Sequence, residues 1–450
     1  MKYVKIRLQS VSDCTSQTVY HRKAIMKTIG IIAEYNPFHN GHAYQIQKIR
    51  ELTNADYIVI AMSGDFVQRG APAILDKYAR TRMALSCGAD LVVELPVLWA
   101  VSSAESFAMA GVTLFDRMGC VDGICFGAET DCLPALSAVA DVLANEPQAY
   151  RSALIDSLKQ GLTFPQARLA ALTKTEVCSL PQEDLAHILE QPNNILAIEY
   201  LKALKRRKSH MVPLLLKREG AGYHDAVLSG SVTGSVSDRA CASATAIRNL
   251  LLTDIMSDHV CDLNRAMPAE AFSVLEDYCR SYPLLDTDDF STLLSYRLLL
   301  EAPCGLERFL DVNRDISNRL LKNRCSFLSF SQFCELNKSR DITYSRMSRI
   351  LLHILLGLTS EDAARGKELD YIPYLRLLGF RKSSSALLSE LKRRADIPII
   401  SKLADAGDLL DQEALLLLHQ DIMAAELYEQ MIAHQKKVPR SEYTREIVVL

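Results

Sequence analysis

The feature that most constrains the fold is a series of short apolar runs, at 28–33, 56–62, 90–95 and 123–126, that alternate with helical patterns. Each run is too short for a helix and is apolar throughout most of its length, as in a parallel strand covered on both faces. Helical spacing of apolar residues fills the intervals at 43–52, 77–87 and 103–115. The alternation predicts an α/β fold with a parallel sheet. Ligands are then expected beyond the carboxyl ends of the strands, in the loops at 34–42, 63–69 and 127–131.

The rest of the chain becomes mainly helical. One further strand-like run lies at 211–217, and a loop rich in glycine and serine lies at 220–238. From 256 to 450 leucines recur at three- and four-residue spacing with almost no β-like alternation, which predicts a separate helical domain. A length of 450 residues fits more than one domain. We therefore expect an extension at 1–25, an α/β domain at 26–255 and a helical domain at 256–450.

The first 25 residues lack the apolar stretch of a secretory signal, so export is not expected. A second methionine, Met26, stands directly before the first apolar run and is a candidate translation start. The alternative is a native tail or an extra strand. The twelve cysteines include no C-x-x-C pair, which indicates free thiols in a reducing cytosol. A cytoplasmic location is therefore expected.

Composition excludes two classes of protein. No stretch approaches the roughly 18 apolar residues of a membrane-spanning helix. The 51 basic and 54 acidic side chains give a net charge of −3, so the chain as a whole does not attract nucleic acid. Any contact with RNA must come from a local basic patch.

The most informative string is EYNPFHNGH at 34–42, where the first strand gives way to the first helix. The spacing of His39 and His42 places both imidazoles on one face at a helix N-terminus, where free N–H groups attract phosphate. Gly41 allows close approach of a phosphate or ribose. Two imidazole donors can stabilise the charge of a pentacovalent phosphorus in nucleotidyl transfer. Two alternatives are half of a metal site, although no third ligand stands at an obvious spacing, and a helix start that only caps itself.

H-x-G-H after a first strand is the signature of the nucleotidyltransferase superfamily, and the wider string closely resembles the tRNA(Met) cytidine acetate ligase family. The resemblance continues through MSGDFVQRG at 62–70, where the family more often has asparagine in place of Asp65. It also covers VELP, FGAE, PNNILAIEY, KREGAGYHD and ASATAIR, at 93–96, 126–129, 192–200, 217–225 and 242–248. The resemblance implies a Rossmann-like parallel sheet forming a nucleotidyltransferase domain, followed by a mainly helical domain that binds tRNA.

The resemblance also implies an ATP site, with His39 and His42 as catalytic residues at the triphosphate. Its remaining members come from the run at 32–41, from three separate positions, and from the segment at 243–248: Ile32, Ala33, Glu34, Tyr35, Asn36, Pro37, Phe38, Asn40 and Gly41; Gly127, Asn193 and Arg218; and Ser243, Thr245 and Arg248. Ordinary structural roles exist for several of them, namely a strand-ending turn at Gly127, helix caps at Asn193 and Ser243, and a surface salt bridge at Arg218. Lys77 and Arg69 are further candidates for phosphate contacts.

Two cationic stretches, at 314–349 and 376–402, lie in the predicted helical domain. They suit a polyanion that docks across both domains, although solvated helix faces often have the same composition. The candidate tRNA contacts are Arg346, Arg349, Arg381 and Lys382.

By resemblance, the reaction is acetylation of the wobble cytidine N4 of elongator tRNA(Met), from acetate and ATP through an acetyl-adenylate. Mg²⁺ is expected to accompany ATP, held by phosphate oxygens and waters rather than by a dedicated protein site. No membrane and no obligate protein partner are expected. The alternatives are a cofactor adenylyltransferase acting on a small molecule and a non-catalytic RNA-binding protein that retains the nucleotide fold.

Overall fold

The structure is a computed structural model that describes residues 27–174, 180–218, 243–253, 260–433 and 438–450. The extension at 1–25, Met26 and the glycine- and serine-rich loop at 220–238 lie outside the described residues. Among the described helices, none combines the length and apolar composition needed to cross a bilayer.

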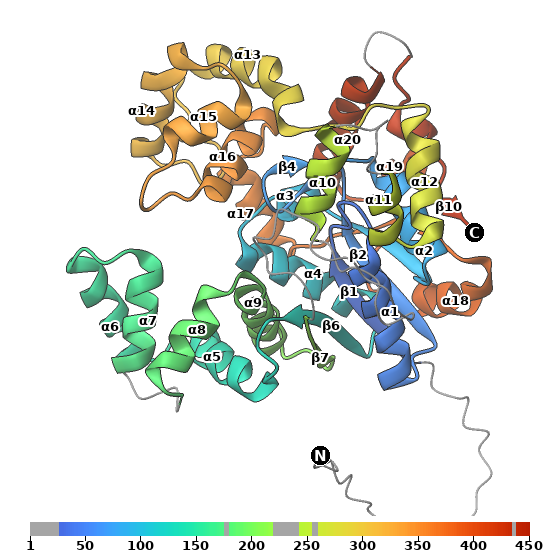
Figure 1. Cartoon of the computed structure of the whole chain (residues 1–450), viewed down its shortest axis with the longest axis horizontal. Helices are drawn as coiled ribbons and strands as arrows, with labels where there is room; N and C mark the ends of the chain where they lie inside the picture. The colour runs from blue at the N-terminus through green and yellow to red at the C-terminus, as the bar shows by residue number, and fades with distance from the viewer. Residues whose placement is uncertain (1–26, 175–179, 219–242, 254–259, 434–437) are drawn as a thin grey trace, which may run out of the picture.

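A sheet in the order β10-β8-β5-β2-β1-β6-β7 runs through the molecule (Figure 1). Five of its strands coincide with the predicted apolar runs: β1 Thr28–Ala33, β2 Tyr57–Ser63, β5 Leu91–Leu95, β6 Gly123–Ala128 and β7 Val212–Lys217. These five are mutually parallel, which confirms the predicted α/β fold. The chain builds outward from β1 to β2 and β5 and then crosses to β6 on the other side. The order therefore reverses beside β1, which is where such sheets bind ligands.

Successive residues of the strands point to opposite faces, and each face has its own hydrophobic core. Val59 and Ala61 of β2 pack in the core that includes α4 (Ala104–Met118) and α9 (Pro192–Arg207). Ile58 and Ile60 pack on the other face with α1 (Asn40–Thr53), α2 (Lys77–Ser86) and α10 (Ala244–Thr253). Since both faces are covered, the strands read as continuous apolar runs. The helices predicted at 43–52, 77–87 and 103–115 correspond to α1, α2 and α4.

Four helices, α5 Leu133–Asn145, α6 Gln148–Lys159, α7 Phe164–Lys174 and α8 Gln182–Glu190, stand between β6 and α9. They extend to the lower left of Figure 1. A helical lobe of α13 Ser291–Glu301, α14 Arg314–Asn323, α15 Phe330–Asn337 and α16 Tyr344–Leu356 lies at the upper left. This lobe reaches the hairpin β3 Phe66–Val67 and β4 Ala71–Pro72, because Ser348 Oγ donates to the Gly70 carbonyl at 2.8 Å.

The C-terminal part is not exclusively helical. Its β8, Leu375–Phe380, pairs antiparallel with β5, and β9 (Ile399–Ile400) and β10 (Val448–Val449) pair with β8. The sequence LRLLGF does not predict a strand, because a leucine-rich run without β-branched residues suits a helix equally well. The described part of 256–450 is mainly helical, as predicted, and it also contributes these three short strands to the sheet, which the sequence did not indicate. The domain boundary at 255 stays a prediction. Strands from both sides of this boundary belong to one sheet.

Helices also flank these strands: α3 Val97–Ala100, α11 Val260–Ala266, α12 Ala269–Cys279, α17 Ser360–Glu368, α18 Ser385–Arg394, α19 Ala406–Leu409 and α20 Gln412–Ala433. The N-terminus of α3 is tied to α20, because Val97 N donates to Asp421 Oδ1 at 2.7 Å. The C-terminal segment thus packs directly on the α/β part of the chain.

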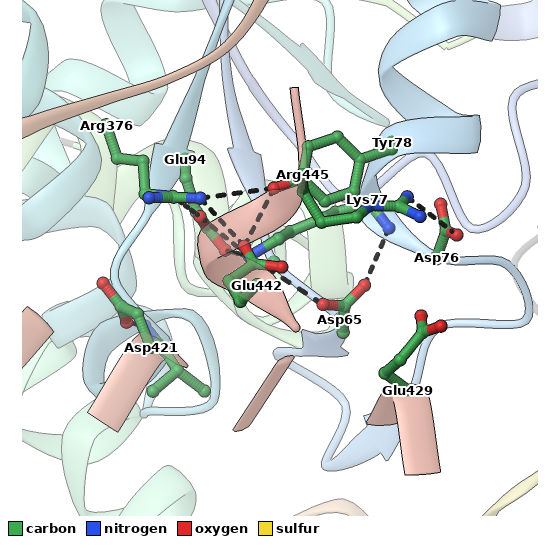
Figure 2. A network of polar contacts seen from close by, with 12 residues as sticks. Asp65, Asp76, Lys77, Tyr78, Glu94, Arg376, Asp421, Glu429, Glu442 and Arg445 are labelled. Carbon is green, nitrogen blue, oxygen red and sulfur yellow. Dashed lines mark hydrogen bonds and ion pairs between the residues drawn. The ribbon is translucent and has the colours of Figure 1, made fainter. Parts of the chain in front are cut away.

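A buried ionic cluster, formed by Lys77, Glu94, Arg376 and Glu442, joins α2 and β5 to the C-terminal part of the chain (Figure 2). Lys77 Nζ lies 2.8 Å from Glu94 Oε1 and 2.7 Å from Glu442 Oε1. Arg376 Nη2 lies 2.9 Å from Glu442 Oε1, and Arg376 Nε lies 3.2 Å from Glu94 Oε2. The ammonium of Lys77 is enclosed by carboxylates, so the structure does not support it as a phosphate contact. Opposite charges satisfy one another here, as burial requires.

Candidate nucleotide site at the start of helix α1

The two histidines of the H-x-G-H string form a capping box at the N-terminus of α1. His39 is the N-cap, and its Nδ1 accepts from the backbone N–H of Gly41 at 3.1 Å. His42 Nδ1 accepts from the backbone N–H of His39 at 3.2 Å. The motif does cap itself, but only through the Nδ1 atoms. This hydrogen bonding assigns the proton of each neutral ring to Nε2, which remains the donor atom of that ring.

Both imidazoles are held neutral. Burial, together with the nearby positive charges of Arg218 and Arg248, lowers the pKa of His39 to about 3. Burial also lowers the pKa of His42 well below its usual value, with contributions from His39 and Arg218. The rings stack with their centroids 3.8 Å apart and an interplanar angle of 25°. Two uncharged N–H donors therefore stand side by side at a helix start whose dipole attracts anions.

Two aromatic residues of the EYNPFHNGH string, Tyr35 and Phe38, pack against the ring of His42. Tyr35 and Phe38 are buried, and their ring centroids lie 4.7 and 5.4 Å from that of His42. Tyr35 takes a positive φ of 49°, which turns the chain between β1 and α1. Within the predicted ATP-binding run, the side chains of these two residues thus serve the core, and only their backbone can face a ligand.

Polar side chains of the same string hold the turn to its neighbours. Asn36 Oδ1 accepts from Ile74 N at 2.8 Å, and Asn40 Nδ2 donates to the Arg265 carbonyl at 2.6 Å. Glu34 Oε1 accepts from Gln68 N at 2.9 Å. The turn at 34–42 and the loop at 63–70 are therefore one hydrogen-bonded unit at the carboxyl ends of β1 and β2. Ile32 and Ala33 end β1, Pro37 lies in the turn and Gly41 lies in the first turn of α1; a direct contact of any of them with ATP stays a prediction.

The structure brings together Gly127, Asn193 and Arg218, which are far apart in the sequence. They lie on β6, at the start of α9 and just after β7. Arg218 Nη1 is 3.5 Å from Asn193 Oδ1, and a Cβ on Gly127 would lie 3.2 Å from Arg218 Cγ. Arg218 is also one of the charges that lower the pKa of His39, so the group lies near the histidines, and its contact with ATP stays a prediction.

Sequence reasoning missed one residue of this group, Glu129. Its carboxylate accepts from Asn193 Nδ2 at 2.5 Å and from Asn194 N at 2.9 Å, so it caps α9. The available signal was the pairing of an acidic residue after a strand with the Pro-Asn-Asn helix start, two features that lie far apart in the chain.

The start of α10 forms a third part of the site. Ser243 Oγ accepts from Ala246 N at 3.1 Å, so Ser243 does cap the helix. Arg248 Nη1 donates to the Asn36 carbonyl at 2.7 Å, and Arg248 Nη2 donates to Thr245 Oγ1 at 3.1 Å. Arg69 Nη1 also donates to Thr245 Oγ1, at 3.3 Å. The three residues predicted here, Ser243, Thr245 and Arg248, therefore stand against the turn that carries the histidines.

The candidate tRNA contacts fall into two places. Arg346 and Arg349 lie on α16, and Arg346 makes a two-pronged ion pair with Asp311, at 2.7 and 3.0 Å. Burial lowers the pKa of Arg349, whose Nη1 lies 3.5 Å from the Gln68 carbonyl. Arg349 thus sits between the helical lobe and the loop at 63–70.

Arg381 and Lys382 follow β8, and Arg381 N donates to the carbonyl of Asp90, which precedes β5. Because β8 is antiparallel to β5, both residues lie at the amino-end edge of the parallel strands, opposite the histidines. Their contact with tRNA stays a prediction, which their distance from the site does not favour.

No group of three or more histidine, cysteine, aspartate or glutamate side chains that could hold a metal ion occurs in the described part of the chain. Both histidine Nδ1 atoms are used by the backbone. The alternative of a half metal site therefore gains no support.

A parallel sheet, a switch point beside β1 and neutral histidines capping the following helix define a nucleotidyltransferase of the H-x-G-H class. In agreement, the model of the HIGH Nucleotidyl Transferase family matches residues 26–443. The chain is 36% identical over 429 residues to the tRNA(Met) cytidine acetate ligase of Acetivibrio thermocellus, covering 94% of this chain and 100% of the relative. It is 39% identical over 404 residues to that of Caldanaerobacter subterraneus subsp. tengcongensis, covering 90% and 95%. The chain belongs to the tRNA(Met) cytidine acetate ligase family, which confirms the predicted family and its ligase class.

A solved structure agrees in fold over nearly the whole chain. The crystal structure of Thermotoga maritima TmcAL bound with alpha-thio ATP has a TM-score of 0.85 and 28% identity, covering 94% of this chain and all of that chain. The predicted fold class is thereby confirmed through the C-terminal part as well.

Proposed function

We propose that this protein acetylates N4 of the wobble cytidine of elongator tRNA(Met), using acetate and ATP through an acetyl-adenylate. The observation that carries the proposal is the pair of neutral Nε2–H donors of His39 and His42 at the start of α1. The names of the relatives and the alpha-thio ATP bound by the Thermotoga maritima protein support it. Transfer of acetate to a tRNA implies a cytoplasmic site of action.

In the first step, an acetate oxygen attacks the α-phosphorus of ATP, and the bond to the β-phosphate oxygen breaks. Pyrophosphate leaves and acetyl-adenylate remains. Negative charge grows on the phosphoryl oxygens, where fixed donors act most strongly. His39 and His42 supply those donors without adding a charge, and Arg218 and Arg248 supply positive charge nearby. No general base is needed, because the acetate carboxylate has no proton to lose.

In the second step, the cytidine amine attacks the acetyl carbonyl, and the bond from that carbon to the AMP oxygen breaks. The amine loses a proton and AMP departs. Mg²⁺ would be carried mainly by the triphosphate oxygens and water, which fits a site whose described donors are imidazole, amide and guanidinium groups. The metal would neutralise phosphate charge as pyrophosphate leaves.

The deciding experiment incubates the purified protein with labelled acetate, ATP and tRNA(Met), followed by digestion to nucleosides. Labelled N4-acetylcytidine, together with equal amounts of AMP and pyrophosphate, is the expected result. A cofactor adenylyltransferase would instead leave AMP attached to a small product and would not need tRNA. Absence of labelled acetylcytidine with every substrate present would overturn the proposal.

A further inference from the structure

We propose that Glu129 is a positioning residue that turns the side-chain amide of Asn193 so that its oxygen faces the nucleotide as a hydrogen-bond acceptor. The inference rests on the proposed use of ATP. It states that Asn193 accepts, rather than donates, in one hydrogen bond with the nucleotide, and that Glu129 fixes this direction.

The evidence begins with the carboxylate of Glu129, which lies just beyond β6 at the N-terminus of α9. Its Oε1 accepts from Asn193 Nδ2 at 2.5 Å and from Asn193 N at 3.4 Å, and its Oε2 accepts from Asn194 N at 2.9 Å. An ionised carboxylate accepts hydrogen bonds and donates none. Asn193 must therefore present its NH₂ group to Glu129, which resolves the usual ambiguity between amide oxygen and nitrogen.

The support for Glu129 is itself rigid. Asn194 is fully buried, and its Oδ1 accepts from the backbone N–H groups of Glu129 and Thr130, each at 3.0 Å. Asn194 Nδ2 donates to Thr130 Oγ1 at 2.8 Å. The end of β6 and the start of α9 are therefore locked to one another in both directions, and the Asn193 amide has one orientation available.

The oxygen of Asn193 faces Arg218, another of the predicted ATP residues. It is 3.5 Å from Arg218 Nη1, at the outer limit of a hydrogen bond, so it retains capacity to accept another. Arg218 in turn lies over Gly127 and acts electrostatically on His39. An acceptor in this place selects a nucleoside group that donates, either the 6-amino group of adenine or a ribose hydroxyl.

The same arrangement excludes phosphate from the start of α9. Glu129 already neutralises the positive end of that helix and occupies its free N–H groups. The triphosphate is left with α1 and α10, whose starts carry the histidines, Thr245 and Arg248. The nucleoside therefore lies toward β6 and α9, with the phosphates toward α1.

The test is Glu129→Gln, which keeps the shape but replaces one acceptor oxygen with an NH₂ group. The Asn193 amide then loses its fixed orientation. We expect KM for ATP in acetate-dependent pyrophosphate exchange to rise about tenfold, equivalent to roughly 1.4 kcal/mol, with kcat changed less than about twofold.

Nucleotide analogues identify the nucleoside group that donates to Asn193. The wild type should disfavour either inosine triphosphate, which lacks the 6-amino donor, or the 2′- or 3′-deoxy forms of ATP. Glu129→Gln should reduce that preference. Asn193→Ala removes the acceptor and should abolish the same preference, which provides a second route to the answer. An unchanged preference in both variants, or a uniform loss toward all nucleotides together with a lowered Tm, would overturn the inference.

Glu105→Gln is the matched control. Glu105 of α4 pairs with Lys202 and Arg206 of the same helix α9, at 2.7 and 2.9 Å, so its neutralisation perturbs α9 without touching Asn193. Its nucleotide preference should equal that of the wild type, and a shift equal to that of Glu129→Gln would also count against the inference. Failure of the wild type to exchange pyrophosphate with ATP and acetate would instead refute the proposed function.

Discussion

The start of α1 and the ionic cluster of Figure 2 are both buried and polar, but they satisfy their polar groups in different ways. In the cluster, Lys77 and Arg376 each contact two carboxylates, Glu94 and Glu442. At the start of α1, donors and positive charge gather around two neutral histidines. In a region where opposite charges compensate, removal of one partner destabilises the fold, because the others stay buried without compensation. A region that collects donors of one kind is completed by a ligand of the opposite sign.

The largest expected effect is on the cluster. Lys77→Met would leave the carboxylates of Glu94 and Glu442 buried without their ammonium partner, which costs about 3–5 kcal/mol of unfolding free energy. Denaturant unfolding measures it. Lys48→Met is the control, since its ion pair with Glu51 is 36% exposed on the lysine side and should contribute less than about 1 kcal/mol. Equal losses for the two variants would contradict the structural role of the cluster.

The next effect is on the site and concerns rate more than stability. His42→Ala removes one Nε2–H donor and should lower acetate-dependent pyrophosphate exchange about a hundredfold, or roughly 3 kcal/mol of transition-state stabilisation. Unfolding free energy should fall by only about 1 kcal/mol, because the variant also loses one capping acceptor. Near-normal exchange would remove the role assigned to His42. A stability loss as large as that of Lys77→Met would erase the contrast between the two regions.

The contrast also shows how far the sequence alone can lead. The continuous apolar runs revealed five parallel strands, and H-x-G-H placed the histidines at the start of a helix. LRLLGF in β8 does not predict a strand, because leucine suits a helix as well as a buried strand. The burial of Arg349 against Gln68 and the capping of Asn193 by Glu129 depend on partners brought together only by the tertiary fold. Local patterns cannot reveal such pairs.

His39 in the site and Asp65 beside the cluster should make contributions to the unfolding free energy that change with pH in opposite directions. The folded-state pKa of His39, about 3, is below its unfolded value of about 6.5, so the unfolded chain binds more protons in acid. That contribution to stability is present above pH 6.5 and is lost as the pH falls toward 3. Burial raises the pKa of Asp65, beside the cluster, to about 7, so its contribution falls as the pH rises from about 4 to 7.

Unfolding free energies at pH 5 and pH 7 would test these signs. His39→Asn should lessen the loss in acid, and Asp65→Asn should improve stability at pH 7 relative to pH 5. Pyrophosphate exchange by the wild type should show no histidine ionisation between pH 6 and 8, because His39 stays neutral throughout. A group titrating near pH 6.5 that disappears in His39→Asn would refute the neutral pair.

The smallest effect concerns the helical lobe and separates Arg346 from Arg349. Arg346 is 39% exposed and paired with Asp311, so Arg346→Gln should change stability by less than about 1 kcal/mol. If Arg346 contacts a tRNA phosphate, its loss makes the plot of log affinity for tRNA against log salt concentration less steep by about one. Acetyl-adenylate formation should be unchanged. Arg349→Gln should impair both steps, because Arg349 touches the loop whose Gln68 binds Glu34.

The control for Arg346 is Arg393→Gln on α18, an exposed arginine paired with Glu390. Helix α18 follows β8 and so begins at the edge of the sheet opposite the histidines. Its variant should keep the wild-type salt slope in filter-binding or anisotropy measurements with tRNA. Equal slopes for Arg346→Gln and the wild type would move the tRNA surface away from α16. If Arg393→Gln reduces the salt slope as much as Arg346→Gln does, tRNA binding depends on overall charge rather than on the helical lobe that contacts the loop at 63–70.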